Sequence, residues 1–307
     1  MLEDIINPFA ADASAELYAA LESLTSNISQ LENTGKLEGE EYSVESLQDV
    51  LTQISANTNL FVTKLKNLFT IGNQVYITEY QTWSAKNAMR IGKVERMSTE
   101  SVAGQLIDIP SGMTGTYGEC ATMLNHLVET LDIFAVLRNV SHTADCILIS
   151  INQGSNSCEG SLASAIAQLA VMRNKTDISF NKLMAMFNFD ATDHAVSVSF
   201  NSQFTDVEAL AQCRKTLANT DKKIVKSSSL VKESQQLETR VNRCVDYLVD
   251  KEPRNENEYK PTPKFVKQLT EYLSDAEHLI NTYGVAITVY MAITHNLTFV
   301  YKKLGGW

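Results

Sequence analysis

Apolar positions recur at alternating steps of three and four residues over long parts of the chain, a spacing that places side chains on one face of an α-helix. The clearest part is 263–304, which opens at Thr262-Pro263, an N-cap and first-turn pair, and ends at Gly305-Gly306. Its apolar seam consists of Val266, Leu269, Leu273, Ala276, Ile280, Tyr283, Ile287, Tyr290, Thr294, Leu297 and Tyr301. The unbroken heptad spacing predicts one long helix.

Two further stretches have the same spacing. One opens at Ser43 and extends to Met97, with seam positions Leu47, Leu51, Ile54, Thr58, Phe61, Leu65, Leu68, Gly72 and Val75. The other begins at a capping box, Thr205-Asp-Val-Glu208, and ends at Lys251-Glu-Pro253, before a polar linker at 254–261. We therefore predict helices over 43–97 and 205–251 as well as 263–304.

The segment 98–204 has a different pattern. Gly and Pro residues predict a loop over 98–118, with a short strand at 106–109, and two helices are expected at 119–151 and 161–187. Residues 194–200 alternate polar and apolar residues with a period of two, which predicts a strand. Its partner is the Leu106 region, the Ile147 region or a second copy of the chain, and the pattern does not choose among them.

These elements predict a mainly α fold: an elongated antiparallel bundle of long heptad helices with a small β-containing insertion. Only 13 Gly and 5 Pro in 307 residues also favour long uninterrupted elements. The expected organisation is an acidic helical leader and linker at 1–42, a long helix at 43–97, an insertion or cap at 98–204, and two long helices within 205–307.

Charge is concentrated near the N-terminus. Residues 1–60 hold eleven acidic residues and one basic residue, Lys36, so the formal net charge of -10 falls within this part. Such a segment is typical of a solvated helix face, and it can also be an arm that docks on a basic partner.

The five cysteines are odd in number, form no C-x-x-C pair, and predict a reducing compartment: Cys120, Cys146, Cys158, Cys213 and Cys244. The first residues lack the basic and apolar regions of a signal peptide. The longest apolar stretch, Val285 to Ile293, is too short to cross a bilayer, so we expect no membrane span.

Two clusters of residues have side chains that could bind a metal or take part in catalysis. His142 and Cys146 lie four residues apart on a predicted helix, with Cys120 and His126 upstream, and could bind zinc; the alternative is a core thiol with a hydrogen-bonded imidazole. The second cluster, Asp190, Asp193 and His194, could act in acid–base chemistry or simply form a turn. No phosphate-binding loop, dinucleotide fingerprint, zinc-protease motif or nucleophile elbow occurs, and we expect no catalytic residue, cofactor or metal.

Two other groups of residues have alternative interpretations. A basic set on the helix 205–251 could contact phosphates, although acids dilute it and stacking aromatics are missing: Arg214, Lys215, Lys222, Lys223, Lys226 and Lys232. An aromatic stripe near the C-terminus is either core or a subunit interface: Tyr283, Tyr290, Phe299, Tyr301 and Trp307. Nucleic acid is the less favoured partner.

Three tripeptides have the form Ala-x-Glu or Ser-x-Glu: Ala20-Leu-Glu22, Ser43-Val-Glu45 and Ser98-Thr-Glu100. With the acidic helical leader, the Asn-, Gln-, Thr- and Ser-rich heptad helices and the odd cysteines, the chain resembles helical structural proteins of large tailed bacteriophages, including internal head and core components. Some of these are trimmed after such tripeptides.

The resemblance implies a non-enzymatic structural or assembly protein that acts through helix–helix and edge-strand contacts, with itself or other virion proteins as partners. It also implies a location in the virion or the host cytoplasm, and no small-molecule substrate. Two alternatives are a pore-forming helical protein in which Val285 to Ile293 inserts into a membrane, and an intracellular regulator that binds a host protein through its acidic leader.

Overall fold

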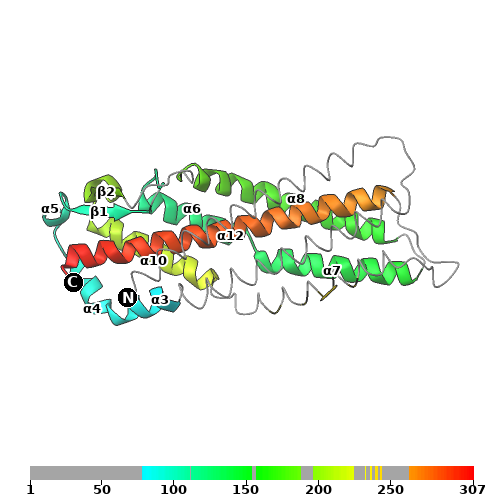
Figure 1. Cartoon of the computed structure of the whole chain (residues 1–307), viewed down its shortest axis with the longest axis horizontal. Helices are drawn as coiled ribbons and strands as arrows, with labels where there is room; N and C mark the ends of the chain where they lie inside the picture. Colours follow the sequence, from blue (N-terminus) through cyan, green and yellow to red (C-terminus); the bar gives the residue numbers. More distant parts are fainter. Residues whose placement is uncertain are drawn as a thin grey trace. The chain divides into compact units, whose positions relative to one another are not determined.

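The computed structural model describes residues 78–110, 112–153, 157–187, 196–224 and 263–307, together with Lys232, Gln236, Thr239, Arg240 and Arg243. This part of the chain is mainly helical and includes one small two-stranded sheet, as Figure 1 shows. The mainly α prediction is therefore confirmed. The leader 1–42, most of the predicted helix 43–97 and the linker 254–261 lie outside the described residues.

The elements follow one another in a simple order. They are α3 (Thr78–Lys86), α4 (Ala88–Val94), α5 (Thr99–Val102), β1 (Leu106–Ile109), α6 (Tyr117–Thr130), α7 (Ile133–Asn152), α8 (Ser157–Met184), β2 (Val196–Ser199), α9 (Phe200–Gln203), α10 (Val207–Ile224) and α12 (Pro263–Gly305).

Helix α12 matches its prediction closely, since it begins at Pro263 and ends at Gly305. Gly306 has a φ of 66°, and the amide of Trp307 donates to the carbonyl of Lys302 over 3.0 Å. A glycine in the left-handed region followed by a bond back to the last turn is the usual way to end a helix. The Gly-Gly pair thus stops α12 where the sequence predicts.

The helix predicted over 119–151 is instead two helices, because the backbone is extended at Leu131, with φ -88° and ψ 90°. The first of them, α6, also begins two residues earlier than predicted. Its N-cap is Thr116, whose hydroxyl accepts from the amide of Glu119 while the Glu119 carboxylate accepts from the amide of Thr116. Neither Gly nor Pro marks the break, but Asp132, a residue type favoured at helix N-caps, directly precedes α7.

The helix predicted from Thr205 is capped one residue later than expected. The carboxylate of Asp206 accepts from the amide of Ala209 over 2.7 Å, and α10 begins at Val207. The described end of the helix predicted over 43–97 also departs from one unbroken helix. There, α3 ends at Lys86 and α4 ends at Val94, and the side chain of Asn87 donates to the carbonyl of Trp83.

The two strands resolve the question of the strand partner. β2 pairs antiparallel with β1, so that Leu106 lies opposite Ser199 and Ile109 lies opposite Val196. The Leu106 region is therefore the partner, whereas Ile147 lies in α7. Ile107 and Ile109 are buried, which fixes the inner face of the sheet.

The described residues fall into two compact units, and each unit draws on several of the predicted segments. The first unit contains 133–153, 157–173 and 263–281, together with the five single residues between 232 and 243. In it, the buried hydroxyl of Tyr272 donates to Asn139 Oδ1 over 2.6 Å, and Asn139 Nδ2 donates to Gln168 Oε1 over 2.7 Å. This chain of bonds connects α12, α7 and α8.

The second unit contains 78–110, 112–132, 174–187, 196–224 and 282–307. Within it α6 packs along α10. Tyr117 at the start of α6 is fully buried, and its ring stacks on Phe204 with centroids 5.4 Å apart. At the other end of the chain, Trp307 stacks on Trp83 at 6.0 Å, and Trp83 also contacts Tyr301.

Two stretches are long and apolar enough to cross a membrane by length and composition, Tyr117–Ser150 and His278–Gly305. The first contains all of α6 and most of α7, and 50% of its most apolar window is buried within the protein. For the second the buried share is 67%. Packing inside the protein is a sufficient reason for their apolar character.

Candidate functional site

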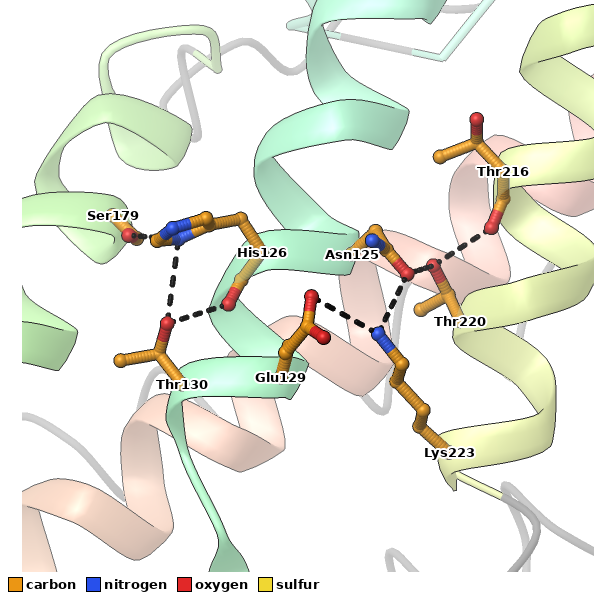
Figure 2. A network of polar contacts seen from close by, with 8 residues as sticks. All are labelled: Asn125, His126, Glu129, Thr130, Ser179, Thr216, Thr220 and Lys223. Carbon is orange, nitrogen blue, oxygen red and sulfur yellow. Dashed lines mark hydrogen bonds and ion pairs between the residues drawn. The ribbon is translucent and has the colours of Figure 1, made fainter.

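The polar network of the second unit is centred on α6, and Figure 2 shows it from close by. On one side of this α6 network, His126 Nδ1 lies 2.8 Å from the hydroxyl of Ser179 on α8. Thr130, one turn further along α6, lies 3.4 Å from the same nitrogen and donates to the carbonyl of His126. His126 therefore links α6 to α8.

The other side of the α6 network faces α10. Asn125 Oδ1 lies 3.3 Å from both the hydroxyl of Thr220 and Nζ of Lys223. Lys223 also forms an ion pair with Glu129 at 3.2 Å, and Thr220 contacts the carbonyl of Thr216 within its own helix. One face of α6 thus supplies two acceptors for a single lysine of α10.

A histidine 2.8 Å from a serine hydroxyl has the spacing of a base and a nucleophile. Ser179, however, is only 3% exposed, so a substrate cannot reach its hydroxyl in this arrangement. The contact that orients His126 comes from the hydroxyl of Thr130 rather than from a carboxylate. The geometry therefore favours a role for the network in fixing the positions of α6, α8 and α10.

A second cluster lies among α4, α10 and α12. Arg214 donates to Glu95 through Nε at 2.7 Å and through Nη2 at 3.3 Å, and the hydroxyl of Tyr301 donates to the same carboxylate at 2.8 Å. Burial raises the pKa of Tyr301 well above its usual range, so its hydroxyl keeps its proton. We call these three residues the Glu95 cluster.

The zinc hypothesis brought together four residues that the structure separates. His142 and Cys146 do lie together, with Sγ 3.6 Å from Nδ1, but Cys120 contacts Met186 and His126 contacts Ser179. Among the described residues, no group of three His, Cys, Asp or Glu side chains is arranged to hold a metal ion.

The described thiols differ sharply in their surroundings, which gives a testable prediction. Cys120 and Cys213 are buried, and burial raises the pKa of each to about 12, whereas Cys146 is partly exposed. Because the thiolate is the reacting form, iodoacetamide at pH 8 should modify Cys120 and Cys213 at least about a hundredfold more slowly than Cys146. Peptide mass spectrometry of the native protein measures this, with urea-unfolded protein as the control. Equal rates in the native protein would contradict the burial.

The basic set of 205–251 is partly neutralised within the fold. Arg214 is paired with Glu95 and Lys223 with Glu129, whereas Lys215, Lys222 and Lys232 are exposed. Lys226 lies outside the described residues, as do Asp190, Asp193 and His194. The acid–base hypothesis for those three therefore stays untested.

The C-terminal aromatic stripe is mostly core. Tyr283, Tyr290 and Tyr301 are each no more than 2% exposed, and Trp307 covers Trp83. Phe299 is partly exposed, lies edge-on to His295 and has the ammonium of Lys302 over its ring. Burial within the chain thus accounts for the three tyrosines.

The sequence did not suggest the Glu95 cluster, because Glu95 and Arg214 lie 119 positions apart. The sequence did contain one local indication of the α6 network. Asn125 and Glu129 are four residues apart, as are His126 and Thr130, so each pair shares a face of a helix.

Large apolar side chains are exposed on both units. In the first unit they are Ile149 and Val171, at 54% and 55% exposure; in the second they are Met89, Leu106, Ile178 and Val196, at 84%, 55%, 62% and 47%. Val171 and Ile178 both lie on α8, seven residues apart, so the helical repeat places them on one face. We call them the α8 apolar pair.

Comparison with known proteins gives no relative: no family model, no curated protein and no solved structure matches the chain.

Proposed function

We propose that the chain is a non-enzymatic structural or assembly component, most consistent with a bacteriophage virion protein, which acts through helix–helix contacts. The observation that carries this proposal is the α8 apolar pair, Val171 and Ile178, at 55% and 62% exposure. Two aliphatic residues one heptad apart on a solvent-facing side of a long helix form the minimal seam for a second helix.

The residues around this pair are also suited to a helical partner. The same face of α8 carries the exposed residues Ala167, Asn174 and Asn181, which are small or uncharged, and the exposed Lys175 and Lys182. Small residues allow two helices to approach closely, and an asparagine in a seam can select one register of pairing. The partner we propose is another copy of the chain or another helical protein of the same particle, within an elongated antiparallel bundle.

Light scattering after size exclusion, over a hundredfold range of protein concentration, tests the self-association part. We expect an oligomer whose fraction rises with concentration, and a shift toward monomer by about tenfold in concentration when Val171→Ser and Ile178→Ser are combined. Ile149→Ser is the matched control, because Ile149 has similar exposure but lies on α7, and it should leave the equilibrium unchanged.

A monomer at every concentration would contradict self-assembly. A second candidate function, that of a membrane-active protein, then gains support from the apolar helix that includes Val285 to Ile293. Leakage of dye from liposomes distinguishes the two, since an assembly protein should cause none.

A further inference from the structure

Four basic side chains follow one another along the outer side of α3, α4 and the turn after α4. All four are exposed, and they lie at steps of four, three and three residues: Lys86, Arg90, Lys93 and Arg96. The amide of Asn87 donates to the carbonyl of Trp83 and the amide of Ile91 donates to that of Asn87, so helical bonding continues from α3 into α4. Steps of three and four residues on a helix place side chains on one side of it. We call these four residues the α3–α4 basic face.

The acids of the same segment mostly lie elsewhere. Within 78–97 the acidic residues are Glu79 and Glu95. Glu95 binds Arg214 on the side of the core, where Ile91 and Val94 are buried. The helical repeat places Glu79 on the basic side, at the first turn of α3. This side of the segment therefore has four bases and one acid.

The contacts of the α3–α4 basic face leave its charges unneutralised. The guanidinium of Arg90 lies 5.1 Å from the centre of the Trp307 ring, and Nε of Arg96 donates to the carbonyl of Gly92 over 2.8 Å. Among the described residues, none of the four bases forms an ion pair with an acid. Like charges that no neighbouring acid balances attract a partner of opposite charge.

The chain itself contains a segment of opposite charge. Residues 38–49 include five acids and no base: Glu38, Glu40, Glu41, Glu45 and Asp49. The formal net charge of -10 falls within 1–60, so the rest of the chain is formally neutral and does not compete for these bases as a whole. Segment 38–49 and the α3–α4 basic face are therefore similar in length and complementary in charge.

We propose that the α3–α4 basic face is the docking site for the acidic segment 38–49 of a second copy of the chain. The inference rests on the self-assembly proposed above and names a contact separate from the α8 apolar pair. The sequence predicts a helix over 43–97, most of which lies outside the described residues. At 1.5 Å per residue, such a helix would separate Glu45 from Lys86 of its own chain by about 60 Å. The acids that match the basic face therefore come from another copy, in a heterologous contact.

Carbodiimide cross-linking of the full chain tests this contact, because it joins a carboxylate to an amine only where the two touch. Equal amounts of unlabelled and ¹⁵N-labelled protein are mixed in 0.5 M NaCl and returned to 0.1 M before the reaction. Peptides of 38–49 should be joined to Lys86 or Lys93 of the other isotope at least about fivefold more often than to Lys215 or Lys222, which are exposed on α10. In samples kept at 0.5 M NaCl the yield should fall at least about fivefold, because salt screens exposed charges.

A charge exchange makes the test specific to this pair of segments. Arg90→Glu combined with Arg96→Glu keeps both reactive lysines of the basic face, and we expect it to lower the cross-link yield at least about fivefold. Adding Glu40→Arg and Glu41→Arg restores opposite charges and should recover at least about half of the yield. The matched control, Lys215→Glu with Lys222→Glu, changes the same number of exposed bases on α10 and should leave the yield at the basic face unchanged.

Three results would overturn the proposal. The first is an equal yield at the basic face and at the α10 lysines. The second is a set of cross-links that join only peptides of the same isotope, since that indicates a contact within one chain. The third is a charge exchange that recovers no cross-links. Light scattering on the same samples separates this contact from self-assembly in general: an oligomer without the cross-links overturns the docking site alone, whereas a monomer at every concentration overturns both.

Discussion

Replacing Tyr117 with alanine is expected to destabilise the second unit by about 3 to 5 kcal/mol, the usual cost of removing a buried aromatic side chain. Tyr117 is fully buried, and its ring stacks on Phe204, with the planes 13° apart. Its hydroxyl donates to the carbonyl of Asp108 over 2.8 Å, and its amide donates to Gln203. One side chain thus joins the start of α6 to β1 and to the segment before α10.

Urea unfolding followed by tryptophan fluorescence measures this loss, because the chain has 2 tryptophans and both Trp83 and Trp307 lie in the second unit. Tyr117→Phe keeps the ring and removes the hydroxyl, so it should cost only about 1 kcal/mol. Met89→Ala, at a side chain that is 84% exposed, should change stability by less than about 0.5 kcal/mol. Equal losses in the free energy of unfolding for Tyr117→Ala and Tyr117→Phe would show that the stacked ring does not contribute to stability.

Arg214→Met is expected to cost about 2 to 3 kcal/mol. The guanidinium makes two bonds to Glu95, and the side chains of Arg214 and Glu95 are 23% and 18% exposed. Removing the cation leaves the carboxylate with Tyr301 as its remaining bonded side chain in the Glu95 cluster. The expected loss is below the 3 to 5 kcal/mol of a fully buried pair because water still reaches both groups.

Two further variants distinguish the loss of the Arg214–Glu95 ion pair from a non-specific loss of stability. Arg240→Met breaks a pair with Asp145 in which both side chains are 42% exposed, so it should cost less than about 1 kcal/mol. Adding Glu95→Gln to Arg214→Met removes the orphaned charge and should recover at least half of the loss. A double variant that is less stable than Arg214→Met would show that the carboxylate is not the source of the cost.

The sequence predicted helix ends well where residues with a distinct backbone preference, such as proline and glycine, occur. The helix ends at Thr262-Pro263 and Gly305-Gly306 were placed to within a residue, since proline fixes the first turn and glycine permits the positive φ of 66° at residue 306. The break at Leu131 differs from the prediction of one helix over 119–151. Leu131 is buried there, and the apolar pattern continues across the break, so that only Asp132, a residue type favoured at helix N-caps, marks the start of α7.

The candidate sites were harder to predict because they depend on pairs that are distant in sequence. Periodicity places His142 and Cys146 on one face, and the two do meet. It gives no information on which acid meets Arg214. Such pairings are set by how helices pack against each other, so a single sequence does not contain them in readable form.

The way the chain passes between its two units affects how it can fold during synthesis. In the described residues the chain leaves one unit for the other at 132–133 and 173–174, again between 224 and 232, and finally at 281–282. Helices α8 and α12 each supply residues to both units. A protein whose domains follow one another in sequence can fold its first domain on the ribosome. Here the first unit lacks 263–281 and the second lacks 282–307 until translation reaches them. Both units must therefore complete their cores late and close together in time, and apolar faces of the earlier helices stay open to chaperones until then.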